Sequence, residues 1–281
     1  MNLCVTSTII PNGNMTWEET AAFAKSVGFD EFDLMLNVPG MTCEDWEKKL
    51  AERAEVCAKA GIRIRFIHTP FDYPALDDAE GWERFRLAEM RAIGKIRELG
   101  ADCAAIHPRT YMKTDYDADE EHRMAVEFLS PYVEHAQKTG AVLALENGRA
   151  PGCEAHHKLR RYGCDLDEFL ALADEMGLGV CWDTGHANTA MLNQYKALKK
   201  VGKRLLEVHI NDNFGNDDQH TAPFCGNVDW KAVTAALREI GYTNSMNLEV
   251  SCKREPPEMY RAYAEYMSAS ARQLVRMTEE R

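Results

Sequence analysis

Short apolar segments alternate with longer amphipathic segments along most of the chain. In residues 83–99, for example, Phe85, Ala88, Ala92, Ile96 and Leu99 recur at the three- and four-residue spacing of a helix with one buried face. Between such helical segments lie short runs of apolar and β-branched residues, which are typical of buried strands. These runs are residues 2–10, 29–36, 62–68, 101–107, 141–147, 178–183, 203–210 and 242–250.

A single glycine separates the amphipathic segments from the apolar runs that follow them. Glycine is favoured just after a helix because it adopts a left-handed backbone conformation at little cost. The glycines are Gly28, Gly61, Gly100, Gly140, Gly177, Gly202 and Gly241. Helix starts are predicted where a capping side chain precedes an acid by three residues, at Thr16 with Glu19, Thr42 with Asp45 and Asp165 with Glu168.

This alternation predicts the fold class. Strands separated by helices run parallel, because each helix returns the chain to the same edge of the sheet. An open doubly wound sheet is the alternative, but no GxGxxG sequence follows the first strand to support it. The chain of 281 residues also contains no linker or low-complexity segment. We therefore predict an α/β protein, a single-domain (β/α)8 TIM barrel over residues 1–281.

Side chains that are able to bind a metal end six of the predicted strands, six to eight residues after the preceding glycine. They are His68, His107, Glu146, Asp183, His209 and Glu249. The carboxyl ends of barrel strands form one ring, where the active sites of such barrels lie. A lone histidine or aspartate at such a position is usually a cap or a hydrogen-bonding loop residue, but six together indicate one site.

A divalent cation is expected at this ring, because converging buried carboxylates repel one another unless a positive charge balances them. Glu146, Asp183, His209 and Glu249 form an oxygen-rich set that suits Mn²⁺, Mg²⁺, Co²⁺ or Zn²⁺. The remaining candidates bind substrate or hold additional metal ions. They are His68, His107, His186, and Asp218 with His220, which form a D-x-H pair.

The composition of the chain limits the partners and the cellular location that we expect. The net charge is −12, from 33 basic and 45 acidic residues, which disfavours nucleic acid and membrane surfaces as partners. The nine cysteines form no CxxC, so we expect reduced thiols in a cytoplasmic protein with no signal peptide and no membrane span. One basic segment, residues 149–163, is either a solvated loop or an anion-binding lid over the site.

Four segments give the chain a family resemblance: ALEN at 144–147, WDTGH at 182–186, VHIND at 208–212 and LEV at 248–250. With them the chain resembles the xylose isomerase-like barrel superfamily of sugar and sugar-phosphate isomerases and epimerases, together with endonuclease IV. In ketose epimerases of this group, residues matching Glu146, Asp183, His209 and Glu249 bind one metal, and the residue matching His186 contacts substrate.

The resemblance implies a metal-dependent isomerase or epimerase for a sugar, sugar acid or sugar phosphate. Glu146 and Glu249 would act as the catalytic residues, one removing and one returning a proton through an enediolate. The chain departs from the epimerases in one respect. They carry an arginine soon after the residue that matches His209, whereas NDNFGNDDQ at 211–219 contains none, which puts free ketohexoses in doubt.

Endonuclease IV supplies the alternative, a phosphodiesterase with a multinuclear zinc site. Residues matching its zinc ligands are all present: His68, His107, Glu146, Asp183, His186, His209, Asp218, His220 and Glu249. The short, nearly uncharged loops PNGNM and NVPGMT argue against a grip on DNA. A third hypothesis is a barrel that binds a sugar without converting it. A homodimer is compatible with each of these readings.

Overall fold

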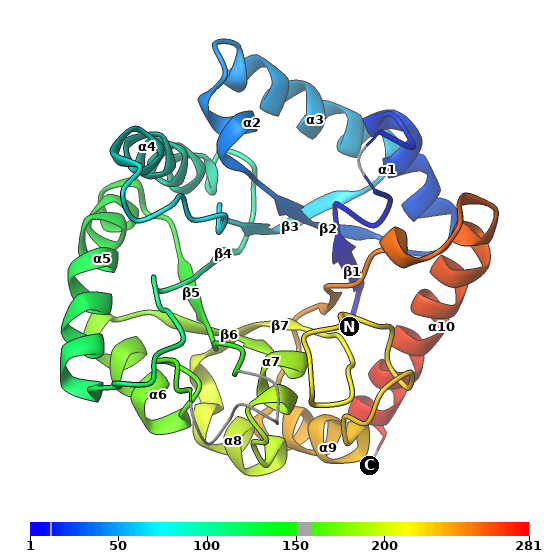
Figure 1. Ribbon diagram of the computed structural model, residues 1–281. Coiled ribbons are helices and arrows are strands. Elements are labelled where there is room, and N and C mark those ends of the chain that lie inside the picture. Colours follow the sequence, from blue (N-terminus) through cyan, green and yellow to red (C-terminus); the bar gives the residue numbers. More distant parts are fainter. Residues whose placement is uncertain (12, 151–158, 281) are drawn as a thin grey trace.

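The computed structural model describes residues 1–11, 13–150 and 159–280, and in them eight parallel strands form a nearly closed barrel (Figure 1). The strands are β1 Leu3–Thr6, β2 Glu31–Met35, β3 Arg63–His68, β4 Cys103–Ile106, β5 Leu143–Glu146, β6 Gly179–Asp183, β7 Leu205–His209 and β8 Met246–Leu248. Each strand lies within one of the predicted segments. The single-domain (β/α)8 TIM barrel predicted from the sequence is thereby confirmed.

Helices surround the strands and cover the outside of the barrel (Figure 1). They are α1 Trp17–Ser26, α2 Val38–Thr42, α3 Trp46–Ala60, α4 Ala79–Lys95, α5 Ala118–Thr139, α6 Leu166–Met176, α7 Thr184–Thr189, α8 Gln194–Val201, α9 Trp230–Ile240 and α10 Tyr260–Glu279. None of these helices combines the length and the apolar character that crossing a membrane requires. The chain ends meet, since the Met1 amino group lies 2.8 Å from the Glu279 carboxylate.

Barrel closure brings the last two strands together. The strand order is β7-β6-β5-β4-β3-β2-β1-β8. Between β7 and β8, Ile210 N donates to Asn247 O at 2.8 Å, and Glu249 N donates to Ile210 O at 3.1 Å. This seam sets the residues that follow β7 and β8 at the same level, next to each other.

Apart from Phe66, the side chains of the barrel interior are mostly small or polar. A compact apolar cluster there consists of Cys4, Phe66, Cys103, Ala105, Ala144 and Cys181. Barrel interiors are usually packed with bulky branched residues. Small side chains here leave space for the polar groups toward the mouth. As predicted, Cys4, Cys103 and Cys181 are buried thiols, and burial raises their pKa well above the ordinary value.

Most of the predicted helix ends are confirmed. Gly61, Gly140, Gly177 and Gly241 end their helices in the left-handed conformation, with φ between 64° and 73°. Thr16 caps α1 in a reciprocal capping box with Glu19. The Asp165 side chain accepts hydrogen bonds from the first turn of α6.

The predicted helix start at Thr42 is wrong. Thr42 is the last residue of the short helix α2, and its hydroxyl donates to the Val38 carbonyl at 2.8 Å. The next helix, α3, begins at Trp46 after Asp45. The pattern missed α2 because its five residues include a proline and a glycine. An N-cap bond from Gly40 N to the Asn37 side chain, 2.8 Å long, stabilises this turn instead.

Candidate metal centre and active site

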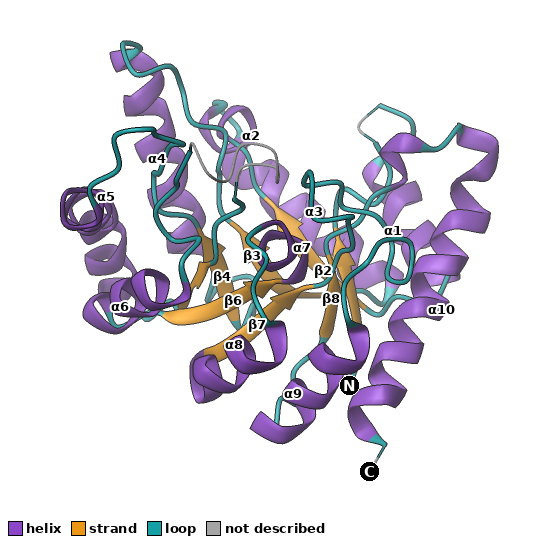
Figure 2. Ribbon diagram, turned by 60° about the horizontal axis from the view of Figure 1, so that its bottom comes forward, coloured by secondary structure: helices purple, strands orange, loops and turns teal. Residues whose placement is uncertain are grey.

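The loops that follow the strands gather at one end of the barrel (Figure 2). The predicted side chains meet at that end. His68, Glu146, Asp183 and His209 are the last residues of β3, β5, β6 and β7. His107 follows β4 and Glu249 follows β8 directly. The other three, His186 on α7 and Asp218 with His220 between β7 and α9, reach the same space.

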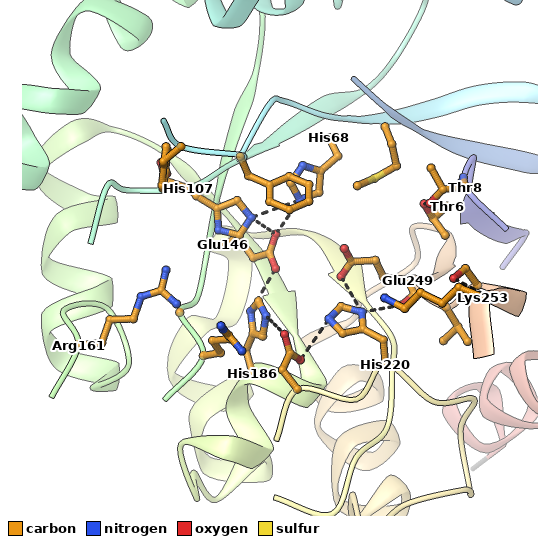
Figure 3. Close-up of a pocket in the computed structure, with 18 residues that line it drawn as sticks. Thr6, Thr8, His68, His107, Glu146, Arg161, His186, His220, Glu249 and Lys253 are labelled. Atoms are coloured by element: carbon orange, nitrogen blue, oxygen red, sulfur yellow. Dashed lines mark hydrogen bonds and ion pairs between the residues drawn. The ribbon is translucent and has the colours of Figure 1, made fainter. Parts of the chain in front are cut away.

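Glu146 is the centre of this arrangement, with four histidines around its carboxylate. Three of them, His68, His107 and His186, are drawn in Figure 3. Its Oε2 atom lies 3.4 Å from His68 Nε2, 3.1 Å from His107 Nε2 and 3.2 Å from His209 Nδ1, and its Oε1 atom lies 3.2 Å from His186 Nδ1. Both His209 and Glu146 are at most 1% exposed. A carboxylate can be buried here because it is surrounded by groups able to donate to it.

Several groups of side chains among the described residues could hold a metal ion, and three of these groups together contain all nine predicted residues. Within each group the candidate ligand atoms lie within 4.8 Å of one another. The three groups are Glu146, Asp183, His209 and Glu249; His68, His107 and Glu146; and His186, Asp218 and His220. The structure therefore brings together the predicted four-residue set, and also the residues that were predicted to bind substrate or further ions.

Hydrogen bonds hold the D-x-H pair in place and offset an unusual backbone conformation at His220. His220 has φ of 47°, which is uncommon for a residue other than glycine. Its Nδ1 lies 2.8 Å from the Glu249 carbonyl, and its Nε2 lies 3.1 Å from Asp218 Oδ1. The other Asp218 oxygen lies 3.3 Å from His186 Nε2. Asp218 thus connects two imidazoles across the mouth.

Asparagines that the sequence analysis did not single out fix Asp183. Asn147 exchanges two hydrogen bonds with the Asp183 backbone, of 3.0 and 2.7 Å. The main-chain carbonyl oxygen of Asn147 also lies 2.8 Å from His186 Nδ1. Asn211 Nδ2 donates to Asp183 Oδ2 at 2.6 Å. The signal for both was present, because Asn147 follows Glu146 directly and Asn211 is two residues beyond His209.

The charges in the cluster shift one another's pKa values. Burial lowers the pKa of His68, but Glu146 outweighs this effect and raises it to about 9. Burial raises the pKa of Glu146, yet His107 and His209 bring it well below the ordinary value. Burial dominates at Asp183 and raises its pKa to about 7. Carboxylates and imidazoles therefore balance one another, so the repulsion argued from sequence is partly relieved by histidines.

Several buried polar atoms of the cluster nevertheless have no hydrogen-bond partner among the described residues. They are Glu146 Oε2, His209 Nδ1, Asp218 Oδ1 and Glu249 Oε2. Leaving such atoms unpaired is costly. All four belong to the candidate ligand groups, and carboxylate oxygen with imidazole nitrogen is a donor set that divalent cations accept. The residues present therefore fit a divalent metal ion.

The site opens into a cavity of about 470 Å³. Arg149, Arg161 and Lys253 line it together with the histidines and carboxylates. Arg161 and Lys253 lie on opposite sides of the cluster (Figure 3), and Arg161 Nε donates to Thr110 Oγ1 at 2.9 Å. Arg160 instead pairs with Glu168 at 3.0 Å. The rest of the predicted basic lid, with His156, His157 and Lys158, lies outside the described residues.

The fold and the site together define the class of protein: a TIM barrel with a ring of histidines and carboxylates at its mouth that could hold a metal ion. The family model described as "Xylose isomerase-like TIM barrel" matches residues 21–270. The chain therefore belongs to the xylose isomerase-like TIM barrel family. This confirms the resemblance seen in the sequence.

Curated relatives match parts of the chain. "Uncharacterized protein y4fM" of Sinorhizobium fredii is 38% identical over 34% of this chain, and the match spans only 33% of that protein. Inosose isomerase of Bacillus subtilis is 27% identical over 52% of each protein. The putative L-ribulose-5-phosphate 3-epimerase SgbU of Escherichia coli is 25% identical over 84% of each.

Solved structures extend the likeness in fold to the whole chain. A D-tagatose 3-epimerase-like protein superposes with a TM-score of 0.75 at 22% identity, covering 100% of this chain and 99% of its own. The IOLI protein, whose structure holds a zinc atom, gives a TM-score of 0.71 at 19% identity, with coverage of 100% and 99%. At these identities the likeness establishes the fold.

Proposed function

We propose that the chain is a divalent-metal-dependent isomerase or epimerase that acts on a sugar, sugar acid or sugar phosphate. The observation that carries this proposal is the pair Glu146 and Glu249, which line one cavity from the non-adjacent strands β5 and β8. Proton transfer beside a carbonyl needs one group to remove a proton and another to return one. The relatives named as an isomerase and an epimerase support the same reaction class.

In this proposal each residue of the cluster has a role. Glu146 is ionised, because the histidines keep its pKa low, and in this role it removes the proton. Glu249 faces the same space and returns the proton, or the two act in the reverse order. His107 and His186 line the cavity beside Glu146 and orient the substrate hydroxyls. Glu146, Asp183, His209 and Glu249 would hold a cation, which would supply polarisation of the substrate carbonyl.

The positively charged side chains that line the cavity favour an anionic substrate over a free sugar. Among the ion pairs of the described residues, none involves Arg149, Arg161 or Lys253, although all three line the cavity. Guanidinium groups bind carboxylate and phosphate oxygens well. A sugar acid or sugar phosphate would supply the missing negative charge. It also agrees with the sequence of residues 211–219, which lacks the arginine found there in the ketose epimerases that this chain resembles.

The test is proton exchange from deuterated water. The purified chain is incubated with Mn²⁺ and a panel of D-tagatose, an inosose and L-ribulose 5-phosphate, and loss of the α-proton signal is followed by NMR. We expect exchange with at least one of these compounds or its close analogues, and a loss of about 10²- to 10⁴-fold in Glu146→Gln and Glu249→Gln. Glu31→Gln, a buried barrel carboxyl outside the cavity, is the matched control. Near-normal exchange in Glu146→Gln would exclude the mechanism.

A second candidate, hydrolysis of a phosphodiester by a multinuclear zinc site, is favoured by one specific observation. His68 with His107, and His186 with Asp218 and His220, complete two further ligand groups around the four-residue set. Bound zinc ions would activate water and stabilise a phosphorane-like charge. Cleavage of an abasic duplex or of bis(p-nitrophenyl) phosphate by zinc-loaded protein, together with no proton exchange, would favour this candidate over the isomerase.

A further inference from the structure

A second layer of buried polar side chains lies directly beneath the candidate metal centre. It consists of Asp33 on β2, Glu207 on β7 and Asn247 on β8, each with 0% of its surface exposed. Glu207 is two residues before His209 on the same strand, so both side chains point to the same, inward face. None of these three residues lines the cavity, and the proposed reaction uses none of them.

His209 connects the two layers through its two ring nitrogens. Nδ1 faces the candidate metal ligands, 3.2 Å from Glu146 Oε2 and 3.3 Å from Glu249 Oε2. Nε2 faces the lower layer and lies at the same distance, 3.4 Å, from Asp33 Oδ2 and from Glu207 Oε1. Neither contact is a well-aligned hydrogen bond. The ring is thus held between two pairs of carboxylates.

Asn247 ties the lower carboxylates into one unit. Its Nδ2 donates to Glu207 Oε1 at 2.8 Å and lies 3.3 Å from Asp33 Oδ2. The only other described donor to Glu207 is the thiol of Cys103, at 3.6 Å, which is a weak one. Two fully buried carboxyl groups need donors. His209 Nε2 is the one further described nitrogen that lies within 4.0 Å of both carboxylates.

We propose that Asp33 and Glu207, bridged by Asn247, are positioning residues that keep the proton of His209 on Nε2 and so direct Nδ1 toward the cation. An imidazole with a proton on Nε2 binds a cation only through Nδ1. A carboxylate behind a metal-binding histidine fixes both the tautomer and the ring orientation. Two carboxylates at the same distance from Nε2 would hold the ring from both sides.

This inference rests on the cation site of the proposed function, but not on the reaction that the site catalyses. Its first test is therefore affinity. Binding of Mn²⁺ and Zn²⁺ to the full chain is measured by competition with a chromophoric chelator. Glu207→Gln and Asp33→Asn are expected to weaken binding by about 10- to 100-fold. Unchanged affinity in both variants, with both folded by circular dichroism, would overturn the proposal.

Glu31→Gln is the matched control. Glu31 is a carboxyl of the same barrel interior, 2% exposed, and it accepts hydrogen bonds from Ser245 and from Asn2 rather than from His209. Its substitution is expected to leave affinity within about threefold of wild type. An equal loss in Glu31→Gln would mean that affinity follows general stability, and would also count against the proposal.

The second test needs no variant, so it stands even if the substituted proteins do not fold. Nitrogen-15 NMR of histidine-labelled wild-type protein reports which ring nitrogen of His209 carries a proton. We expect a slowly exchanging proton on Nε2 in both the metal-free and the zinc-loaded protein. A zinc-loaded protein with the proton on Nδ1, or a metal-free one with Nε2 unprotonated, would refute the inference. If no cation binds at all, the proposed function fails together with the direction of Nδ1 toward a cation, while the metal-free spectrum still decides whether Nε2 carries the proton.

Discussion

Glu89 is a carboxyl group in an environment that penalises its charge. It lies on α4, is 2% exposed, and receives one hydrogen bond, from Thr69 Oγ1 at 3.2 Å, while its second oxygen has no partner among the described residues. Burial raises its pKa from 4.5 to about 8. Such a group is neutral in the folded protein at a pH where it is ionised in the unfolded chain.

The shift predicts how stability depends on pH. A raised pKa in the folded state means that the contribution of Glu89 is fully present below pH 4.5 and is lost progressively up to about pH 8. At 1.36 kcal/mol per pKa unit, the full loss is roughly 5 kcal/mol. Glu89→Gln removes this titration. The free energy of unfolding of the variant and of wild type is measured in urea at pH 5 and pH 9. The difference, variant minus wild type, should be larger at pH 9 than at pH 5 by a few kcal/mol. Parallel pH profiles would contradict the prediction.

The sequence predicted site residues where they end strands and missed those inside strands. His68, Glu146, Asp183 and His209 are terminal strand residues, so a count from each glycine was enough to find them. Asp33 and Glu207 occupy strand interiors, where a periodic pattern predicts only which face a side chain takes. The spacing of Glu207 and His209 gave a usable signal, two residues apart on one face. The approach of His209 to Asp33, which lies on a distant strand, depends on barrel closure, and no local sequence pattern encodes that closure.

At the scale of elements, the accuracy of the predictions follows the length of the periodic signal. The long helices were predicted because each repeats its period several times, and the strands were predicted because most of them are short apolar runs that follow a glycine. Short elements such as α2 and α7 span five or six residues, fewer than two turns, and show no amphipathic period. Their caps come from side chains such as Asn37 and Asp183, which also suit ordinary turns.

The short helix α7 depends on a close approach that only glycine permits. A Cβ atom on Gly185 would lie 1.9 Å from Asn211 Oδ1 and 2.8 Å from Asn213 Nδ2. Asn211 donates to Asp183, so it has to move if Gly185 gains a side chain. Gly185→Ala is therefore expected to lower the free energy of unfolding by about 1–3 kcal/mol. It should also weaken Mn²⁺ binding, because Asp183 loses its support.

Gly148→Ala is the control for this prediction. Gly148 also lies at the mouth, but among the described residues a Cβ atom there would approach nothing closer than 3.5 Å, from Cys164 Sγ and Tyr162 O. Urea denaturation and chelator competition on both variants separate a steric effect from a general sensitivity of the mouth. Equal behaviour of the two variants would show that the contact between Gly185 and Asn211 is unimportant.

At the scale of the whole molecule, the topology assembles the site. Eight units in sequential order place six strand ends in one ring, which is why a count along the chain found a three-dimensional cluster. The number of ions could not be predicted in this way. Glu146 belongs both to the group with Asp183 and to the group with His68 and His107, and the difference between one ion and several rests on distances of a few ångströms.

Metal content therefore distinguishes the two candidate functions. The chain is purified without chelators or a histidine tag, and its metal ions are quantified by inductively coupled plasma mass spectrometry. The isomerase proposal predicts about one ion per chain, bound by Glu146, Asp183, His209 and Glu249. Under that proposal Asp183→Asn should lose the ion, because it alters one of the four ligands. Asp218→Asn should keep it, because Asp218 lies 3.1–3.3 Å from His186 and His220, outside that set.

The opposite outcome has an equally definite meaning. About three zinc ions per chain in wild type, falling in Asp218→Asn, would make the residues of the D-x-H pair and His186 ligands rather than substrate contacts. The histidines around Glu146 would then be neutral, each with a proton only on the ring nitrogen that does not bind zinc. Glu146 would bridge two ions instead of accepting a proton from a sugar. That result would shift the assignment from proton transfer to phosphodiester hydrolysis without changing any residue of the site.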